Sequence, residues 1–275
     1  MKKSGLLLLL AGALLATGCG GTGKDGGNTL SVIGSSSVAP LAETESEYYL
    51  RVNSDVRIDV QSVGSSAGIK AVADGTAMVG MSSRNLSPEE KEGMQEFVVA
   101  LDGIAVVIHP DNPLDNISRE DLLKIFQGEI TNWKELGGED APIVIISREE
   151  GSGTRGAFEE ITGLEVEKDG KKYTTLGRNA IITDGNGSVK QNVALKKNSI
   201  GYVSVGSVDD SLKVLAVDGV HPTEASIKAG LYLISRPFIF ITKGEPGPEA
   251  QAFIDYILSP EGQKHVREHF YISVL

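Results

Sequence analysis

Short apolar runs alternate with amphipathic stretches along most of this chain, and that alternation constrains the fold more than any other feature. "LSVIGS" (30–35) is typical of a buried strand, and the residues after it favour a helix over about 38–51. The same order returns with "VRIDVQSV" (56–63), which is followed by a predicted helix near 67–73. Strands that alternate with helices predict an α/β fold built mainly on parallel sheets.

The rest of the chain continues this pattern. Pro88 is expected to start a helix of acidic and basic residues, and Pro110 to stop the strand before it. Trp133, the only tryptophan, is expected to pack in a core. Further strands are predicted at 78–83, 103–110, 142–147, 199–205, 213–217 and 237–243.

Residues 1–19 are typical of a secretory signal peptide. Lys2 and Lys3 precede an apolar run over 6–15, and small residues lead to Cys19. The run is shorter than the roughly 20 apolar residues that a membrane span needs. Cys19, the only cysteine, follows "ATG" in the manner of a bacterial lipobox, in which the cysteine is lipidated. The alternative is a short membrane anchor that is never cut.

Residues 20–28 are rich in glycine and polar side chains, which indicates a flexible tether to a folded part that starts near Thr29. The folded part is long enough for two lobes, and no later stretch is apolar enough for a membrane span. The formal net charge is −11, and without Lys2 and Lys3 it is −13, from 24 basic and 37 acidic residues. This charge argues against a nucleic-acid partner, and an anion site must rely on local donors.

Four strand-to-helix junctions carry the same chemistry. Ligands of α/β sheets bind at the carboxyl ends of strands, beside helix N-termini whose N–H groups and dipole attract anions. Each junction supplies serine or threonine hydroxyls, and three place glycine beside them, which lets the backbone approach a ligand closely. One such junction is most simply a helix cap, but four together predict an oxyanion site. The junctions are "GSSSVAP" (34–40), "VGSSAG" (63–68), "GMSSRNLSPEE" (80–90) and "SREEGSGTRGAF" (147–158).

The fourth junction carries the strongest signal. Arg148 can form a bidentate pair with an oxyanion, and residues 152–154 offer two hydroxyls and an open glycine N–H. Arg155 lies in the first helical turn, where a cation opposes the helix dipole, so it needs an anion, either a ligand or Glu159 at i+4. The junction is not a nucleotide P-loop, because "GSGT" lacks the Lys-Ser/Thr pair that follows the second glycine.

With these motifs the chain resembles the phosphate-binding protein of the bacterial high-affinity phosphate ABC transporter over nearly all of 29–275. "RxxGSGT" (148–154) is the most specific motif, and "GSSAG" (64–68) and "IGYVS" (200–204) also fit the family. The resemblance implies a two-lobed α/β fold of the periplasmic-binding-protein type (type II), with mixed sheets flanked by helices and a ligand cleft between the lobes. It implies a binding protein and not an enzyme, with no cofactor and no metal.

The resemblance also implies which residues hold the phosphate. The hydroxyl of Ser37 and the N–H of Val38 would donate from the first helix start, and Ser65 would donate from the second. The other lobe would contribute Arg148, Ser152, Gly153 and Thr154.

The third junction departs from the family pattern. Many members have an aspartate in a "GxSD" sequence that accepts the proton of hydrogen phosphate, and this chain has Ser83 at that place. The rejection of sulfate, which carries no proton, is therefore an open question, although Ser83 could accept a proton through its lone pairs. Arg84 could add charge to the site or pair with an acid on the surface.

The crossing strands of this family divide the chain into its lobes. The chain is expected to cross near 107–110 and to return near 235–237. Lobe 1 would then comprise 29–108 and 237–275, and lobe 2 would comprise 109–236.

A phosphate importer implies partners and a location. The resemblance implies permease and ATPase subunits, a lipid anchor at Cys19, and a place on the outer face of the cytoplasmic membrane, at the cell surface or in the periplasm. A monomer is expected, because no long exposed apolar stripe is evident.

Other interpretations remain open. The ligand could be another tetrahedral oxyanion (sulfate, molybdate or arsenate), and the protein could be a surface phosphate sensor. "HVREH" (265–269) matches the H-x-x-E-H zinc-peptidase pattern, with His265 and His269 one helical turn apart and Glu268 as the base. Its place close to the C-terminus disfavours it, because no room is left for a further glutamate ligand.

Overall fold

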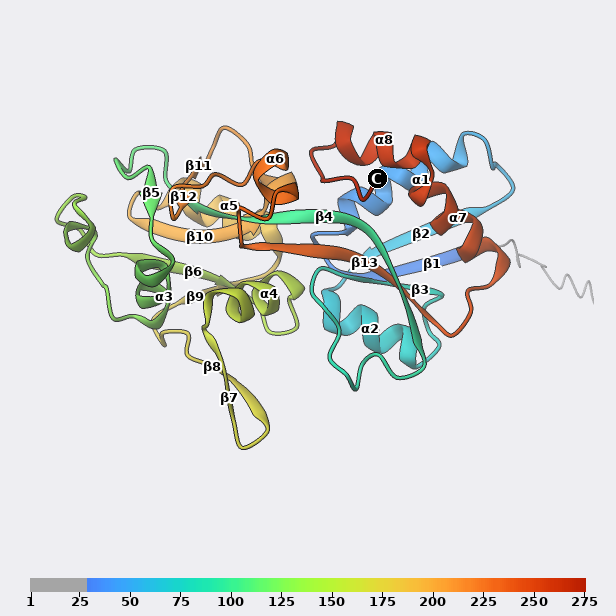
Figure 1. The fold of residues 1–275 in the computed structure, drawn as a ribbon, viewed down its shortest axis with the longest axis horizontal. Coiled ribbons are helices and arrows are strands. Elements are labelled where there is room, and N and C mark those ends of the chain that lie inside the picture. The colour runs from blue at the N-terminus through green and yellow to red at the C-terminus, as the bar shows by residue number, and fades with distance from the viewer. Residues whose placement is uncertain (1–28) are drawn as a thin grey trace, which may run out of the picture.

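The computed structural model describes residues 29–275. The predicted signal peptide at 1–19, the lipidation at Cys19 and the tether at 20–28 lie outside the described residues. Two lobes lie side by side and are joined by the long strands β4 (Met94–Ile108) and β13 (Ser235–Lys243), as Figure 1 shows. The predicted α/β class with mixed sheets flanked by helices is confirmed.

The first lobe, on the right in Figure 1, holds the N-terminal strands and the two last helices of the chain. Its elements are β1 (Thr29–Gly34), α1 (Ala39–Leu50), β2 (Arg57–Ser62), α2 (Ser65–Ala73), β3 (Val79–Ser82), α7 (Pro248–Leu258) and α8 (Pro260–Glu268).

The second lobe holds the middle of the chain, including the β7–β8 hairpin that projects from the body in Figure 1. Its elements are β5 (Asn116–Ile117), α3 (Arg119–Gln127), η1 (Trp133–Leu136), β6 (Val144–Arg148), α4 (Gly153–Thr162), β7 (Glu165–Lys168), β8 (Lys171–Thr174), β9 (Ile181–Thr183), α5 (Gly185–Leu195), β10 (Ser199–Ser204), η2 (Val205–Ser207), β11 (Lys213–Val214), β12 (Ala216–Val217) and α6 (Glu224–Lys228).

One sheet runs through both lobes in the order β2-β1-β3-β13-β4-β10-β6-β9, and β11 also pairs with β4. The outer strands of each half are parallel: β1 pairs with β2 and β3, and β6 pairs with β9 and β10. The central strands β13 and β4 are antiparallel to their neighbours. The parallel pairs therefore place the carboxyl ends of several strands together in each lobe, and these ends are where a ligand is expected.

The first crossing lies nearer the N-terminus than predicted. β4 pairs with β13 as far as Gly103 and with β10 from Ile104 onward. Val106 and Ile108 pack in the core of the second lobe together with Ile104. The crossing is thus at Gly103, and the prediction of 107–110 was wrong. The apolar run of β4 continues through the crossing, so the sequence does not show where the chain passes from one core to the other.

The return crossing lies in the first residues of β13. Ile234 packs in the core of the second lobe and Phe238 in that of the first. Ser235 is paired with Gly103, so the two strands change lobe at the same level. We therefore propose that lobe 1 comprises 29–103 and 236–275, and that lobe 2 comprises 104–235.

Each lobe has its own core. In lobe 1, Phe240 of β13 packs beside Phe253 of α7, and their ring centroids lie 6.0 Å apart. In lobe 2, Phe158 of α4 stacks on Tyr202 of β10 with ring centroids 4.0 Å apart. Trp133 is buried in the lobe 2 core, as expected, and its indole N–H donates to the carbonyl of Asn198 at 2.9 Å.

Two predicted elements are wrong in detail. Pro88 starts no helix: the residues up to β4 form turns, and the carboxylate of Glu90 accepts hydrogen bonds from Arg84 and from the N–H of Ser87. These contacts hold the segment as a loop, and Gly93 has a φ of 71° immediately before β4. The strand expected at 213–217 is two short strands, β11 and β12.

Candidate functional site

The first three junctions meet at one edge of lobe 1. β2, β1 and β3 are parallel neighbours, so their carboxyl ends lie together and the residues after them converge. Ser37 follows β1, Ser65 starts α2 after β2, and Ser83 follows β3. All three are buried. The structure thus brings the predicted site residues of lobe 1 together.

The fourth junction approaches this edge from lobe 2. Ser152 is the N-cap of α4, and its hydroxyl accepts a hydrogen bond from the N–H of Arg155 at 3.3 Å. Two residues further on, the hydroxyl oxygen of Thr154 lies 2.7 Å from that of Ser37. A side-chain hydrogen bond therefore joins the two lobes at the predicted site.

Gly153 lies at the closest approach of the lobes. A Cβ atom added there would lie 2.7 Å from the hydroxyl oxygen of Ser83 and closer still to that of Ser65. Neither neighbour can retreat easily, since both serines are buried. Only glycine fits at this position while the lobes are in contact.

Five residues at the lobe boundary are here called the hydroxyl cluster: Ser35, Ser37, Ser65, Ser83 and Thr154. The hydroxyl pair of Ser37 and Thr154 is linked to the other three hydroxyls through the backbone N–H of Ser37. Ser35 donates its hydroxyl hydrogen to Ser83 at 2.7 Å. The backbone N–H of Ser83 donates to the hydroxyl of Ser65 at 3.1 Å, and the two hydroxyl oxygens lie 3.5 Å apart. Sequence reasoning assigned Ser35 no role, although its motif was singled out.

The structure gives the N–H of Val38 a partner within its own turn. This N–H donates to the carbonyl of Ser35 at 3.1 Å, and Val38 is the N-cap residue of α1. The N–H of Ser37 donates to the side chain of Ser35 at 3.2 Å. In this arrangement the first helix start contacts lobe 2 through the hydroxyls of Ser36 and Ser37, and not through the N–H of Val38.

Arg148 is buried at the end of β6 and reaches across to lobe 1. Its Nε and Nη2 donate to the two carboxylate oxygens of Glu149, each at 2.8 Å. Nη2 also donates to the hydroxyl of Ser36 in lobe 1 at 3.0 Å, and Nη1 donates to the side chain of Asn186 at 3.1 Å. The guanidinium is thus held in place by bonds to both lobes.

The Glu149 carboxylate keeps this arginine neutralised. Burial alone would raise the pKa of Glu149, but the hydrogen bonds and the charge of Arg148 outweigh burial and hold that pKa below its ordinary value. The N–H of Gly185 also donates to the carboxylate at 3.3 Å. Glu149 is therefore ionised at neutral pH and faces Arg148 rather than the hydroxyl cluster.

Asn186, in the first turn of α5, is the main residue that sequence reasoning missed. Its Nδ2 donates to the hydroxyl of Ser37 across the lobe boundary at 2.9 Å. Its Oδ1 accepts from Arg148 and, at 3.3 Å, from the N–H of Ser204. The available signal was "TDGNGS" (183–188), a fifth junction between a strand and a helix.

The "IGYVS" motif, in β10, contacts the end of β6, the strand that carries Arg148. The hydroxyl of Tyr202 lies 2.8 Å from that of Ser147 and accepts a hydrogen bond from the N–H of Arg148 at 3.4 Å. Burial raises the pKa of Tyr202 to about 12, so the phenol stays neutral. The motif thus positions the site residue and does not itself join the hydroxyl cluster.

The two further arginines are paired with carboxylates. Arg84 forms a bidentate pair with Glu90, at 2.7 and 2.8 Å, and donates to the hydroxyl of Ser66 at 3.1 Å. Arg155 pairs with Glu159 at 2.7 Å, which is the i+4 alternative that the sequence left open. Both arginines lie beside the hydroxyl cluster without contacting it through a hydrogen bond.

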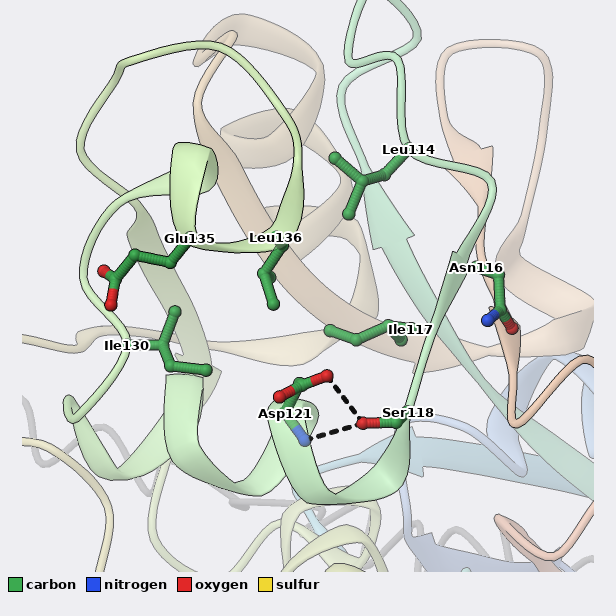
Figure 2. A pocket seen from close by; sticks show the side chains of 8 residues that line it. All are labelled: Leu114, Asn116, Ile117, Ser118, Asp121, Ile130, Glu135 and Leu136. Atoms are coloured by element: carbon green, nitrogen blue, oxygen red, sulfur yellow. Dashed lines mark hydrogen bonds between the residues drawn. The ribbon is translucent and has the colours of Figure 1, made fainter.

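Two cavities were compared with the hydroxyl cluster, one at the lobe boundary and one within lobe 2. One of about 440 Å³ lies at the boundary between the lobes, beside Arg84, Ser152 and Arg155. Another, of about 520 Å³, lies in lobe 2, and Figure 2 shows the side chains that line it. Some of the polar groups that line it are hydrogen-bonded to one another: the hydroxyl of Ser118 donates to the carboxylate of Asp121 at 2.7 Å. None of its lining residues belongs to the hydroxyl cluster.

The "HVREH" residues do not form a metal centre. His265 stacks on Tyr48 with ring centroids 3.7 Å apart, and its Nδ1 lies 3.6 Å from the buried carboxylate of Glu45. Glu268 points to Lys264 on the surface, at 3.5 Å. Over residues 29–275 no group of three His, Cys, Asp or Glu side chains is placed to hold a metal ion. None of the helices described there is long and apolar enough to cross a membrane.

Comparison with known proteins places the chain in a family. Residues 21–261 match the model of the PBP superfamily domain. The chain is 33% identical over 297 residues to the phosphate-binding protein PstS of Bacillus subtilis, which covers 100% of this chain and 95% of that relative. It is 30% identical over 280 residues to the PstS of Borreliella burgdorferi, with 100% and 99% covered.

Solved structures agree with these sequence matches. A Clostridium perfringens protein, described as a candidate substrate-binding protein of a phosphate ABC transporter and solved with bound phosphate, is 44% identical with a TM-score of 0.85. The match covers 90% of this chain and 100% of that one. An ABC-type phosphate transport receptor from Vibrio cholerae is 34% identical with a TM-score of 0.75 over 88% of this chain and 99% of that one. The chain therefore belongs to the PBP superfamily and, within it, to the family of PstS phosphate-binding proteins.

Proposed function

We propose that this protein captures inorganic phosphate between its two lobes and delivers it to the membrane subunits of an ABC importer. The observation that carries the proposal is the hydroxyl cluster, where Ser37 of lobe 1 and Thr154 of lobe 2 meet. Hydroxyls and helix N-termini from two lobes suit a small tetrahedral oxyanion, because each oxygen can receive several donors. Binding needs no metal and no cofactor.

The proposed phosphate ligands are the residues that the sequence indicated. They are Ser37, Val38, Ser65, Ser83, Arg148, Ser152, Gly153 and Thr154. A bound phosphate would replace the hydrogen bonds that the hydroxyls make with one another, and α1, α2 and α4 would direct their N-termini toward it. Arg84 and Arg155 would act at a distance through their charge, since both are paired with carboxylates.

Release requires the lobes to separate, and the two crossing strands are the place for the hinge. The long strands β4 and β13 run between the two cores and cross at Gly103 and Ser235. The segment after α8 lies beside them, with Tyr271 in the lobe 1 core and Ile272 in the lobe 2 core. A small change in the backbone angles of the two strands would open the boundary while the rest of each core stays packed. Phosphate would then favour the closed form, because it makes contacts with both lobes only there.

The cellular context is part of the same proposal. Cys19 would carry the lipid that holds the protein on the outer face of the cytoplasmic membrane, and residues 20–28 would let the two lobes reach the permease. The permease and ATPase subunits of the importer would be its partners, and the protein would act as a monomer.

Transport and sensing give different results in the host bacterium. Deleting the gene should abolish uptake of radioactive phosphate supplied at low concentration, and the wild-type gene should restore it. A Cys19→Ala gene should restore less uptake, because the protein is no longer anchored. A gene that encodes the Thr162→Val protein, with its substitution at the C-terminal end of α4, should restore uptake fully and serves as the control. Normal phosphate uptake in the deletion strain would contradict the transport proposal and leave phosphate sensing as the remaining function.

Phosphate binding itself is tested on the isolated protein. Residues 20–275, stripped of bound anion, should give heat on titration with phosphate, with a dissociation constant in the micromolar range or below, which corresponds to about 8 kcal/mol or more. Absence of heat with phosphate would contradict the proposed ligand.

A further inference from the structure

The last residues of the chain lie across the lobe boundary beside β4. Tyr271 is buried in the lobe 1 core, where its ring centroid lies 5.4 Å from that of Phe238. The next residue, Ile272, is buried in the lobe 2 core. One short segment therefore reaches into both cores. Residues 270–275 are here called the C-terminal strap.

The strap is hydrogen-bonded to β4 at the level of the crossing. The N–H of Leu101 donates to the carbonyl of Ile272 at 2.8 Å, and the N–H of Ile272 donates to the carbonyl of Leu101 at 3.0 Å. β13 lies on the other edge of β4, where Pro237 is the partner of Leu101. From Ile104 onward β10 pairs with β4 on the edge away from β13. In lobe 1 the strap thus occupies the edge of β4 that β10 occupies in lobe 2.

Gln263 of α8 fixes the strap to lobe 1. Its side chain is fully buried, and Nε2 donates to the carbonyls of Val99 and Ile257 at 2.8 and 3.0 Å. Its Oε1 accepts from the hydroxyl of Ser273 and from the N–H of Val274, each at 2.9 Å. Both hydrogens and both lone pairs of the amide therefore have partners. Held by this residue, the strap moves with lobe 1.

A strained turn brings the strap back from α8 to the lobe boundary. The N–H of Phe270 donates to the carbonyl of Arg267, and the N–H of Tyr271 donates to that of Val266, each at 3.1 Å, which is the pattern of a Schellman motif. Phe270 has a φ of 64°, in the left-handed region that such turns usually give to glycine, and its side chain is 80% exposed. The conformational cost of this turn is offset by the contacts of the residues that follow it.

Two contacts join the strap to lobe 2. Ile272 packs in the core that also holds Ile234, and it is 2% exposed. The ring of Tyr271 lies against Gly206 of η2, where an added Cβ atom would lie 2.5 Å from the ring. Only glycine leaves room for the ring there. Neither contact involves a residue of the hydroxyl cluster, so both join the lobes independently of the proposed ligand site.

We infer that the C-terminal strap holds lobe 2 against lobe 1 and thereby sets the equilibrium between the closed and the open form. The strap is fixed to lobe 1 through Gln263, while the side chain of Ile272 is buried in lobe 2. Opening draws lobe 2 away from the strap and exposes Ile272, and exposure of apolar surface to water is unfavourable. The inference rests on the proposed function in one respect, because it takes phosphate to favour the closed form.

Two variants loosen the strap from lobe 2 by different routes. Ile272→Ala removes most of the side chain that is buried there, and Gly206→Ala places a methyl group against the ring of Tyr271. Both should bind phosphate about tenfold more weakly, because the apparent dissociation constant rises as the closed fraction falls. Calorimetric titration of residues 20–275 measures this change. Gly206→Ala leaves the cores intact and decides the matter if Ile272→Ala does not fold.

Matched controls separate loss of the strap from loss of packing. Ile254→Ala removes an equally large buried side chain from α7 in the lobe 1 core, and Gly247→Ala adds a methyl group that meets nothing within 4 Å. Both should bind phosphate as the wild type does. Ile254→Ala should nevertheless lower the free energy of unfolding in urea, as Ile272→Ala does, because each leaves a cavity in a core.

The outcomes distinguish the inference from the proposed function. Weaker phosphate binding confined to the two strap variants supports the inference. Unchanged or tighter binding in both, or an equal loss in Ile254→Ala, overturns it and leaves the proposed function intact. A wild type that binds no phosphate overturns the proposed function, and small-angle X-ray scattering of the unliganded proteins then judges the strap. A larger radius of gyration in the two strap variants alone supports the inference, and equal radii overturn it.

Discussion

The hydroxyl oxygens of Ser37 and Thr154 lie 2.7 Å apart, although the two residues belong to different lobes and are 117 positions apart in the chain. Both residues are buried, and both lie where a strand passes into a helix. This contact is where the two halves of the proposed phosphate site meet.

Thr154→Val tests the contact with little change in shape. The variant should bind phosphate about 10- to 100-fold more weakly, because a hydrogen bond to a charged ligand contributes about 1.5–3 kcal/mol. Calorimetric titration measures the effect. Thr162→Val is the matched control: its hydroxyl donates to the carbonyl of Phe158 at the far end of the same helix, so phosphate affinity should not change. Equal loss in both variants would contradict a specific role for Thr154.

Gly153→Ala tests the approach of the lobes. The new methyl group would collide with the hydroxyls of Ser65 and Ser83, so the lobes could not close and phosphate affinity should fall by about 100-fold or more. Folding should be unaffected, since alanine favours the helix more than glycine does. Gly187→Ala in α5 is the control, because a methyl group there meets nothing within 4 Å. Unchanged affinity in Gly153→Ala would show that the lobes do not meet in this way when ligand binds.

Asp102 and Arg236 form a buried ion pair where the crossing strands meet, with Nη2 of Arg236 2.9 Å from the carboxylate. Ser204 also donates to this carboxylate, at 2.9 Å. Asp102→Ala should lower the free energy of unfolding by about 3–5 kcal/mol, since it leaves a buried guanidinium without its partner. Urea unfolding measures the change.

The double variant Asp102→Ala/Arg236→Met checks the cause of that loss. Removing both charges should cost less stability than Asp102→Ala alone, because no unpaired charge then remains in the interior. A double variant as unstable as the sum of both single changes would assign the loss to packing instead.

Glu45 predicts a pH dependence of stability. This side chain is fully buried in α1, neither carboxylate oxygen accepts a hydrogen bond, and burial raises its pKa to about 8. The groups that face it include His265, whose Nδ1 lies 3.6 Å away. Since the pKa is higher in the folded than in the unfolded state, the folded protein holds a proton that the unfolded chain releases. The contribution is complete below the ordinary pKa of 4.5 and is lost as the pH rises to about 8.

Glu45→Gln removes this dependence while it keeps the shape. The variant should have the same free energy of unfolding as the wild type near pH 4.5 and a larger one near pH 8. The difference should grow by at most about 1.4 kcal/mol per pH unit. Urea unfolding of both proteins at several pH values gives the comparison. A constant difference across the range would mean that Glu45 ionises equally in the folded and unfolded states.

The sequence predicted which residues meet at the lobe boundary wherever local chemistry determines their place; that they bind phosphate stays a prediction. A serine or threonine beside a helix start has few other roles than capping or binding, and parallel strands bring such starts to one edge. Ser37, Ser65, Ser83 and Thr154 are for that reason found together. The sequence also predicted the i+4 pair of Arg155 with Glu159 as one of two alternatives.

Contacts between distant segments were beyond prediction. Asn186 touches Ser37 only because β6, β9 and α5 are placed by the whole of lobe 2, and an asparagine beside glycine is just as typical of an ordinary turn. The crossing at Gly103 has the same origin: the apolar residues on either side of it are chemically alike but belong to different cores.

The most direct test of the central claim is a crystal structure of residues 20–275 grown with phosphate. We expect one phosphate at the lobe boundary, with its oxygens at hydrogen-bond distance, about 2.7–3.2 Å, from the hydroxyls of Ser37, Ser83 and Thr154. Phosphate found instead in the lobe 2 cavity of Figure 2, or only on surface side chains, would contradict the account.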